Sequence, residues 1–289
     1  MTYQLPLFPV VDPDPLQETP DPLTLLRKGA ALVLSVSGGK DSDAMTHHLL
    51  DLRQSEGWSG NAIMIHADLG ARVEWHQTPD YVRELARRKG VPLHVVRWQH
   101  GDLIDRIWQR YYKDPSRPCW PSAKMRYCTA DLKRGPISRG IRNLFPTGNV
   151  ICAMGLRAQE SHARAKRQTF APRTDSSAPT KRRFVYDWLP IHDWTEGDVW
   201  DCIQRHGNVY HEAYTYGNQR LSCALCVLAS LNDLINGAVH NPDTYCEYCR
   251  IEAVTGYSFR KEFWLSSLRP EILPQETLDA VHEHQRKIG

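Results

Sequence analysis

The sequence predicts an α/β protein built on a doubly wound, mostly parallel sheet of about five to six strands. Short apolar runs with strand character recur along the first two thirds of the chain, and segments with helical periodicity lie between them. This alternation is typical of a parallel sheet that helices cover on both faces. Glycine-containing polar motifs follow several of the runs, at the strand ends where such sheets bind ligands.

Composition places the chain among soluble globular proteins. Of its 289 residues, 41% are hydrophobic and 24% are charged, and no apolar run approaches the roughly 20 residues of a membrane span. The N-terminus lacks the regions of a secretory signal, so we expect a cytoplasmic protein with no membrane partner. In that compartment the eight cysteines are expected to be thiols or metal ligands. The net charge of +3 does not by itself indicate nucleic-acid binding.

The chain divides into three predicted parts. Residues 1–20 contain many prolines and few periodic apolar positions, which predicts a flexible N-terminal arm. Residues 21–215 hold the alternating strands and helices of the main domain. Residues 216–289 contain four of the cysteines and are expected to form a helical region packed on that domain.

The first half of the main domain is predicted to alternate strands with helices. Strand character is found over residues 31–36, 61–67 and 93–98. Helical periodicity or helix-start signals are found over residues 21–26, 41–52, 78–90 and 101–112. Asp41 and Ser42 are expected to cap the helix that follows the first strand.

The rest of the chain continues this pattern with longer loops. A proline-rich segment over residues 114–121 predicts a rigid loop. Strands are expected over residues 149–154 and 183–191. Helices are expected after Thr195, where Thr195 and Asp198 resemble a capping box, from Pro242 onward, and over residues 274–288.

Residues 157–183 form the most basic segment of the chain. Only Glu160 and Asp175 oppose its basic side chains, which are Arg157, Arg164, Lys166, Arg167, Arg173, Lys181, Arg182 and Arg183. Prolines and serines replace apolar periodicity here, which predicts a mobile loop. A solvated surface loop would explain the charges, but the position after a strand favours binding of an anion.

The stretch from Ser37 to Ser42, Ser-Gly-Gly-Lys-Asp-Ser, follows the first strand and precedes a helix. Glycines let backbone N–H groups approach phosphate oxygens, and the helix N-terminus favours negative charge. Lys40 adds a positive charge. The loop is not a Walker A sequence. An ordinary glycine turn is the alternative, but the strand–loop–helix context favours a phosphate cradle.

This loop resembles the pyrophosphate loop, or PP-loop, of the N-type ATP pyrophosphatases. Four later segments match one family in order, and they are residues 67–70, 128–136, 155–164 and 190–226. Together these motifs, over about residues 30–260, resemble the phosphoadenosine phosphosulfate (PAPS) reductase family within the adenine nucleotide alpha hydrolase-like fold. The resemblance implies that residues 21–215 are a PP-loop ATP pyrophosphatase domain, which cleaves ATP between the α- and β-phosphates and adenylylates an acceptor.

One departure from the family bears on the function. Reductases of this family carry a cysteine in a C-terminal motif that attacks the sulfate sulfur, and no cysteine follows Cys249 here. The pattern is closer to the branch that includes the ATP pyrophosphatases of DNA phosphorothioation. A sulfonucleotide (PAPS or APS) reductase that borrows a thiol is one alternative. A non-catalytic, nucleotide-dependent nucleic-acid-binding subunit is the other.

The resemblance also implies roles for individual residues. Lys40, Asp41 and Arg157 are the expected catalytic residues, with Mg²⁺ held by Asp41 or Asp68. Glu160 is expected to orient Arg157, and Arg164 to bind the acceptor anion. The remaining residues expected to bind the nucleotide are Ser37, Gly38, Gly39, Ser42, His66, Gly70 and Gly155.

Three cysteines are candidate ligands of a 4Fe–4S cluster. Cys223 and Cys226 form a C-x-x-C pair, and Cys128 lies at the position that matches the family's cluster ligand. A cluster usually takes four thiolates, and the sequence does not choose between Cys119, Cys246 and Cys249 for the fourth. The rival is a Zn²⁺ site made by the two pairs Cys223, Cys226, Cys246 and Cys249. Cys152 and Cys202 are expected in the core.

The phosphorothioation resemblance implies two macromolecular partners. DNA would be the acceptor, with the basic segment 157–183 holding its phosphates. A cysteine desulfurase or another sulfur donor would supply the sulfur. The sequence leaves open whether the protein forms a homo-oligomer or a multi-subunit complex.

Overall fold

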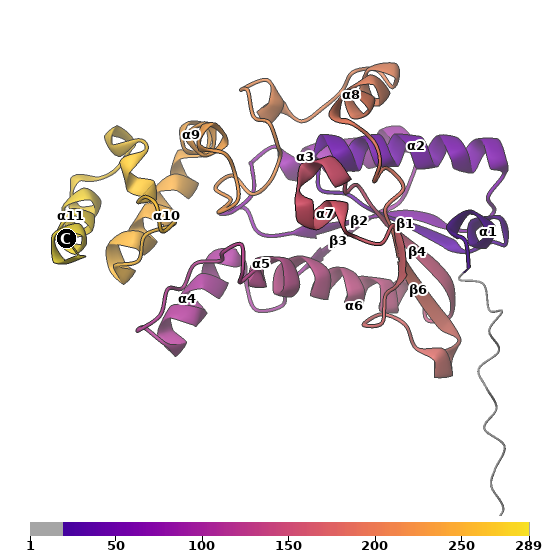
Figure 1. Cartoon of the computed structure of the whole chain (residues 1–289), viewed down its shortest axis with the longest axis horizontal. Helices are drawn as coiled ribbons and strands as arrows, with labels where there is room; N and C mark the ends of the chain where they lie inside the picture. The colour runs from indigo at the N-terminus through magenta and orange to yellow at the C-terminus, as the bar shows by residue number, and fades with distance from the viewer. Residues whose placement is uncertain (1–19, 289) are drawn as a thin grey trace, which may run out of the picture.

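The computed structural model describes residues 20–288, so most of the predicted N-terminal arm and Gly289 lie outside the described residues. Within them, a six-stranded sheet has the order β3-β2-β1-β4-β6-β5. Neighbouring strands are parallel except that β5 runs antiparallel to β6 at one edge. The predicted α/β class with a mostly parallel sheet is confirmed (Figure 1).

The strands lie close to the positions that the sequence predicts. They are β1 (Ala31–Ser35), β2 (Ala62–Asp68), β3 (Leu93–Arg97), β4 (Gly148–Met154), β5 (Phe170–Pro172) and β6 (Arg183–Trp188). The short edge strand β5 was not expected. It lies inside the basic segment 157–183, which therefore is not a featureless loop, and the helix α7 (His162–Ala165) lies in the same segment.

The other helices surround the sheet and form the C-terminal region. They are α1 (Pro22–Arg27), α2 (Lys40–Glu56), α3 (Thr78–Lys89), α4 (Leu103–Lys113), α5 (Tyr127–Thr129), α6 (Gly135–Leu144), α8 (Glu196–Arg205), α9 (Leu231–His240), α10 (Pro242–Thr255) and α11 (Gln275–Ile288). The predicted capping box of Thr195 and Asp198 opens α8. Helices α6 and α9 were not predicted.

The central strand β1 places alternate side chains on the two faces of the sheet. Leu32 and Leu34 pack in the apolar cluster that includes residues of α2, α3 and α8. Ala31 and Val33 pack in a second cluster with residues of α6 on the opposite face. Figure 1 shows α2 and α8 above the sheet and α6 below it. The sheet is therefore covered on both faces, as its alternating sequence pattern predicts.

A separate apolar cluster joins the C-terminal helices to the loop after α4. Trp120 stacks on Tyr248 of α10, with ring centroids 5.6 Å apart, and packs edge-on against Phe259. The Trp120 indole Nε1 also donates a hydrogen bond to the carbonyl oxygen of Tyr257 (2.9 Å). These contacts connect loop 114–121 to the helices of residues 216–288. The domain boundary near residue 215 stays a prediction.

One local prediction at the start of α2 is wrong. Gly39, not Asp41 or Ser42, is the residue at the N-cap, and no side chain caps the helix there. Asp41 and Ser42 lie in the first turn. In residues 20–288, no helix is both long and apolar enough to span a bilayer.

Candidate functional site

The sheet order creates a crevice at the carboxyl ends of β1 and β4. From β1 the chain proceeds to β2 and β3 on one side, and it returns to β4 on the other. In open α/β sheets such a reversal of strand order leaves a gap where ligands bind. The loop after β1 carries residues 37–42, and the loop after β4 carries Gly155 and Arg157. Two predicted motifs 113 or more residues apart (155 − 42) therefore meet at one point.

The loop from Ser37 to Ser42 forms a tight turn into α2. Gly38 has a φ of +78°, a backbone conformation that glycine adopts without steric cost. The Ser42 hydroxyl donates to the carbonyl oxygen of Gly39 (2.8 Å) and accepts from the backbone N–H of Ser37 (3.2 Å). The loop is closed by its own serine, and the N-cap residue Gly39 has no side chain to bind the first N–H groups of α2. The first of them, that of Lys40, donates to the Tyr214 hydroxyl (2.9 Å).

Gly155 explains how the two loops approach so closely. A Cβ atom at this position would lie 2.5 Å from the carbonyl oxygen of Asp41 and 2.7 Å from the backbone nitrogen of Ser42. Both are backbone atoms and neither can move without shifting the first turn of α2. The β4 loop thus packs directly on the helix N-terminus because residue 155 has no side chain.

Lys40 is almost fully buried, with 2% of its surface exposed. Its ammonium donates to the carbonyl oxygen of Gln219 (2.7 Å) and lies 3.2 Å from a carboxylate oxygen of Glu196. The ring of Tyr214 lies against it, with 5.4 Å from Nζ to the ring centroid. The predicted phosphate-binding cation is therefore held inside the site by groups of the chain itself.

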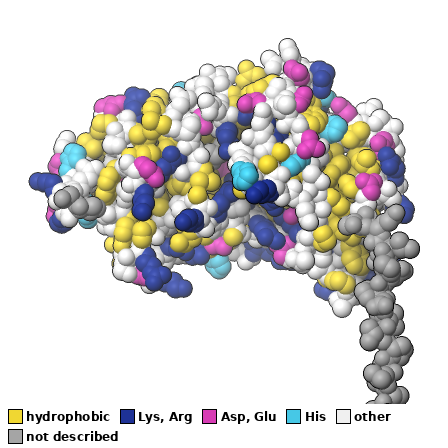
Figure 2. Space-filling model, viewed as in Figure 1, with side chains coloured by type: hydrophobic (Ala, Val, Ile, Leu, Met, Phe, Trp, Pro, Cys, Tyr) yellow, Lys and Arg dark blue, Asp and Glu magenta, His cyan; other side chains and the backbone are white. Residues whose placement is uncertain are grey.

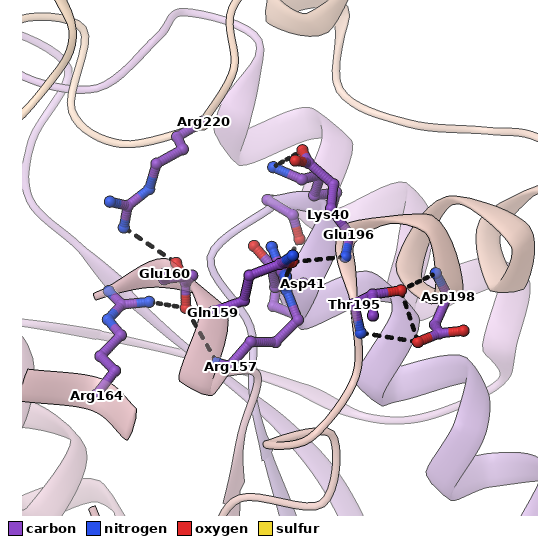
Figure 3. A network of polar contacts seen from close by, with 12 residues as sticks. Lys40, Asp41, Arg157, Gln159, Glu160, Arg164, Thr195, Glu196, Asp198 and Arg220 are labelled. Atoms are coloured by element: carbon purple, nitrogen blue, oxygen red, sulfur yellow. Dashed lines mark hydrogen bonds and ion pairs between the residues drawn. The ribbon is translucent and has the colours of Figure 1, made fainter. Parts of the chain in front are cut away.

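Arg157 lies on the other side of the loop and is 3% exposed. Its guanidinium pairs with the Asp41 carboxylate and donates to the side-chain carbonyl of Gln159 (2.8 Å). That same Gln159 oxygen accepts from the backbone N–H of Glu196 at the start of α8 (2.9 Å). The structure thus brings together the three residues expected to be catalytic, and it links them to α8 (Figure 3).

Glu160 is the centre of a second group of charges. Its carboxylate pairs with Arg164 and lies 3.1 Å from Nη2 of Arg220. It also accepts from the backbone N–H of Arg157 (3.0 Å), so it contacts the Arg157 main chain, while Asp41 and Gln159 hold the guanidinium. Burial lowers the pKa of Arg164, Glu160 opposes this change, and the positive charges of Arg220 and Arg126 add to it. The guanidinium groups of Arg164 and Arg220 therefore share one buried carboxylate, which the backbone of Arg157 also contacts.

The functional groups at the end of β2 are bound mainly to other groups of the chain. Asp68 accepts from the backbone N–H of Gly70 (2.8 Å) and from Nε of Arg97 (2.8 Å). Gly70 has a φ of +104°, and a Cβ there would lie 2.5 Å from the Cβ of Asp102. His66 lies buried, with Nδ1 3.0 Å from the carbonyl oxygen of Val36. Burial works to lower the pKa of His66, but its contact with Glu74 raises it above the ordinary value.

Three predicted cysteine ligands share one electrostatic environment beside Lys133. Burial raises the pKa of Cys128, Lys133 opposes this rise, and the neighbouring Cys226 adds to it. Burial likewise raises the pKa of Cys223; Lys133 opposes this rise, and Cys226 and Cys128 add to it. The hydroxyl of buried Tyr248 has no hydrogen-bond partner in the described structure, and Cys223 and Cys226 act on its pKa, which burial raises.

The other proposed ligands, Cys119, Cys246 and Cys249, belong to the same apolar cluster as Cys128 and Cys223, but the trio is not among the main influences on their pKa. Cys119 is buried in the cluster around Trp120, and burial raises its pKa to about 11. Thr255 and Arg110 oppose this rise. Within α10, burial raises the pKa of Cys249, and the neighbouring Cys246 adds to this rise. Among residues 20–288 no group of three or more His, Cys, Asp or Glu side chains is arranged to hold a metal ion. The residues therefore do not assemble the four thiolates that a 4Fe–4S cluster or the rival zinc site needs.

The basic segment contributes fewer free charges than its sequence suggests. Arg157, Arg173 and Arg183 are buried. Arg173 lies 3.2 Å from Asp187, and Arg183 donates to the carbonyl oxygen of Ser176 (2.8 Å). The exposed cations of the segment are Lys166, Arg167, Lys181 and Arg182.

The model of the phosphoadenosine phosphosulfate reductase domain matches residues 31–229. The chain belongs to this family. A curated relative, an uncharacterised 37.8 kDa protein of Escherichia phage 186, is 32% identical over 240 residues, which are 70% of this chain and 68% of the relative. The matched region includes both loops of the crevice, as well as Cys128, Cys223 and Cys226.

Solved structures with similar arrangements are more distant. One is PAPS reductase from Candida auris in a phosphate complex, at 18% identity and a TM-score of 0.44, with 66% of this chain and 80% of that chain covered. Another is the U34-tRNA thiolase NcsA from Methanococcus maripaludis with its 4Fe–4S cluster, at 15% identity and a TM-score of 0.46, with 89% and 72% covered. At such TM-scores neither likeness identifies the substrate of this chain.

Sequence reasoning missed several residues that complete the site. Glu196 and Tyr214 contact Lys40, and Arg220 contacts Glu160. Of these three residues, only Glu196 lies in a segment that the sequence marks as a helix start, because it stands between the capping-box residues Thr195 and Asp198. Tyr214 and Arg220 lie within segment 190–226, which resembles the family, but no residue type or spacing singles them out there. Tyr214 is 174 residues from Lys40 in the chain.

Proposed function

We propose that this chain is an ATP pyrophosphatase of the PAPS reductase family that adenylylates an acceptor for sulfur transfer. The observation that carries the proposal is the convergence of Lys40 and Arg157 on the glycine loop at the strand crevice. Two buried cations beside the N–H groups of a helix start that has no N-cap side chain form a site suited to a polyphosphate.

The loop would hold the β- and γ-phosphates of ATP. Backbone N–H groups of the first turn of α2 point out of the helix, and the helix dipole favours negative charge there. The Lys40 ammonium would exchange Gln219 and Glu196 for phosphate oxygens. These interactions strengthen as negative charge builds up on the leaving pyrophosphate, which is how they accelerate the reaction.

Arg157 would act at the α-phosphate. An acceptor oxygen attacks the α-phosphorus, the bond to the oxygen that bridges to the β-phosphate breaks, and pyrophosphate leaves with the bonding electrons. Arg157 lies across the loop from Lys40 and would stabilise charge on the α-phosphate oxygens. Arg164 and Arg220, now shared by Glu160, would hold the acceptor anion.

Asp41 is the carboxylate that fits a magnesium ion. It lies at the loop and its side chain is 17% exposed, whereas Asp68 is held by Arg97 and Gly70. Mg²⁺ is usually bound by one or two carboxylates together with substrate phosphates. When bound it would offset the charge of the pyrophosphate. Asp41 would then release Arg157 toward the α-phosphate.

DNA phosphorothioation is the sulfur-transfer reaction that we assign to the site. A non-bridging DNA phosphate oxygen would accept the AMP. A persulfide on Cys223 or Cys226, formed by a donor such as a cysteine desulfurase, would then attack the DNA phosphorus, and AMP would leave with that oxygen. The other thiol of the pair would attack the S–S bond, so that the DNA keeps the sulfur and the pair is oxidised to a disulfide. The exposed cations Lys166, Arg167, Lys181 and Arg182 lie in the segment that follows Arg157 and Arg164, where DNA phosphates could be held. The thiols of Cys223 and Cys226 are candidates to receive the sulfur.

The test is measurement of pyrophosphate released from ATP by the pure protein, with the acceptor DNA present. Lys40→Met and Asp41→Asn are expected to lower the rate by about 100-fold or more, because each removes a charge used in the transition state. Lys113→Met, which removes an exposed charge at the end of α4 and outside the basic segment, is the matched control and keeps the wild-type rate under the same conditions. Release of orthophosphate by the wild type would contradict the proposal.

A sulfonucleotide reductase is the second candidate, because the matched family model is that of a PAPS reductase domain. It would convert PAPS or APS to sulfite with a thiol reductant as electron donor. Incubation with each sulfonucleotide and reduced thioredoxin, followed by assay of sulfite, separates the two activities. Sulfite formation without pyrophosphate release from ATP would favour the reductase.

A further inference from the structure

Residues 214–221, here called the strap, lie across the phosphate loop. The Tyr214 hydroxyl accepts a hydrogen bond from the backbone N–H of Lys40 (2.9 Å) and another from the backbone N–H of Leu221 (3.3 Å). The Lys40 N–H is the first of the N–H groups at the start of α2, which have no acceptor within the helix. A side chain of the strap therefore already occupies the donor that a phosphate oxygen would use.

The strap also fills the space above the two glycines. A Cβ atom on Gly38 would lie 3.4 Å from Cδ2 of Leu221, and one on Gly39 would lie 3.5 Å from both the Leu221 Cβ and the Tyr214 hydroxyl oxygen. These are ordinary van der Waals contact distances. The Leu221 side chain thus rests directly on the part of the loop where glycine lets a ligand come close.

The Lys40 ammonium is occupied by the strap as well. It donates to the carbonyl oxygen of Gln219 at 2.7 Å, and Arg220, the next residue, pairs with Glu160 at 3.1 Å. The strap thus engages the loop backbone, the loop lysine and the carboxylate that joins the arginines. Figure 3 shows the last of these contacts, between Arg220 and Glu160. The Lys40 N–H, the Lys40 ammonium and the Arg220 guanidinium each have a stronger partner available in a phosphate oxygen.

The far side of the strap is attached to α9. Asn232 donates to the carbonyl oxygen of Gly217 (3.0 Å), Asn236 donates to that of Tyr216 (2.8 Å), and Asp233 accepts from the backbone N–H of Gln219 (2.9 Å). Gly217 has a φ of +86°. The strap is thus attached to α9 at one side and rests on the phosphate loop at the other.

We propose that the strap is a self-occupying lid that ATP displaces when its phosphates enter the loop. This inference rests on the proposed function, because it takes the loop to be the ATP phosphate site. Displacement frees Lys40 from Gln219 and Arg220 from Glu160. Lys40 and Arg220 can therefore bind phosphate only when the strap is open. After Ser222 the chain enters Cys223, so the movement also reaches the cysteine pair. ATP binding and the position of Cys223 and Cys226 are thereby coupled.

The experiment compares Tyr214→Phe with the wild type in binding of α,β-methylene ATP, which cannot be cleaved between the α- and β-phosphates. Loss of the hydroxyl removes a hydrogen bond that exists only in the closed strap, so Tyr214→Phe is expected to bind about three- to tenfold more tightly by calorimetry. Tyr210→Phe is the matched control with unchanged affinity. Tyr210 packs edge-on against Tyr214, with centroids 6.3 Å apart, but does not contact the loop.

Hydrogen exchange supplies the second readout. Addition of α,β-methylene ATP to the wild type is expected to speed exchange in the peptides that cover residues 214–228, while the peptides of α2 become more protected. Unchanged or weaker binding by Tyr214→Phe, or a strap that gains protection with the nucleotide, would overturn the lid. Absence of nucleotide binding by every variant would instead overturn the proposed function, so the two failures are distinguishable.

Discussion

Gly155 is the residue whose size matters most for the site. Its missing side chain lets the β4 loop touch the backbone of Asp41 and Ser42. Gly155→Ala would push the loop off the first turn of α2 at a cost of about 1–3 kcal/mol, and we expect ATP binding to weaken by about tenfold or more. Calorimetric titration with the nucleotide measures this change.

Gly197→Ala is the control for that substitution. A Cβ on Gly197 would meet only the Thr195 hydroxyl at 3.6 Å, an ordinary contact, and the residue is exposed in the first turn of α8. If Gly155→Ala bound ATP as tightly as the wild type and Gly197→Ala do, the contact between the two loops would not be needed for binding.

Asp43 makes stability depend on pH. Burial raises the pKa of its carboxyl to about 7, although the Tyr81 hydroxyl donates a hydrogen bond to it. In the unfolded chain an aspartate titrates near pH 4, so between about pH 4 and pH 7 the folded protein binds more protons. The free energy of unfolding should therefore fall as pH rises through this window, by up to about 4 kcal/mol.

Asp43→Asn removes the titrating group while keeping an oxygen that can accept from Tyr81. The variant should show a flatter pH dependence and gain stability relative to the wild type above about pH 7. Urea unfolding at about pH 5 and about pH 8 measures the difference. Parallel pH profiles for the two proteins would show that Asp43 does not carry the effect.

The residues that sequence could find are those that a local motif holds together. Lys40 and Asp41 are adjacent in one loop, and Arg157 follows a strand in a recognisable segment. Tyr214 and Arg220 reach the same site only because the chain returns across the crevice after α8. No spacing or periodicity in the sequence marks such a return.

Among the elements, α10 is tied to the chain that follows it by one buried acid. Glu252 accepts from the backbone N–H groups of Phe259 (2.7 Å), Leu265 (2.8 Å) and Ser266 (3.0 Å). Glu252→Ala would leave all three donors buried without a partner, at about 1–3 kcal/mol each before relaxation. We expect a loss of about 3–5 kcal/mol in the free energy of unfolding, measured with urea.

Glu247→Ala on the same helix is the matched control for α10. Its carboxylate lies 3.8 Å from Arg72 and 4.0 Å from Arg250, and its side chain is 26% exposed. Contacts of this kind contribute about 0–1 kcal/mol. Equal effects of the two substitutions would mean that the three N–H groups find water instead.

The elements that sequence missed have identifiable causes. Helix α6 begins with Gly135 and Pro136, which suggest a turn, yet proline in the first helical turn fits the missing hydrogen bonds of a helix start. Helix α9 contains Asn232, Asn236 and Gly237, which are poor helix formers, and a Cβ at residue 237 would lie 2.1 Å from the carbonyl oxygen of Ala224. Packing overrides local preference in both.

At the scale of the whole molecule, a sheet domain meets a helical region that contains four cysteines. Figure 1 shows the C-terminal helices at the side of the sheet where α4 and α5 lie, and Figure 2 shows Lys and Arg side chains across the middle of this face. Cys128 comes from α5, and Cys223 and Cys226 from the loop before α9. Sequence identified this trio through resemblance, but it did not identify a fourth ligand, because that choice depends on tertiary packing.

Metal content tests which cysteines act together. A metal bound by Cys128, Cys223 and Cys226 would require these thiols to move into ligand geometry, because no group of described side chains is arranged to hold a metal ion. If they do so, iron or zinc measured in anaerobically purified protein falls to near zero in Cys128→Ser, Cys223→Ser and Cys226→Ser. Cys246→Ser is the control and should keep wild-type metal content. Loss of zinc on substitution of Cys246 or Cys249 would favour the rival zinc site, and protein without either metal would favour three plain thiols.

The central claim is that the loop from Ser37 to Ser42 holds the phosphate tail of ATP. A crystal structure of the full chain with α,β-methylene ATP and Mg²⁺ tests it most directly. The account predicts that β- and γ-phosphate oxygens accept from the backbone N–H groups at the start of α2, with Tyr214 moved off the Lys40 N–H. A triphosphate that points away from this loop, with Lys40 still bound to Gln219, would contradict it.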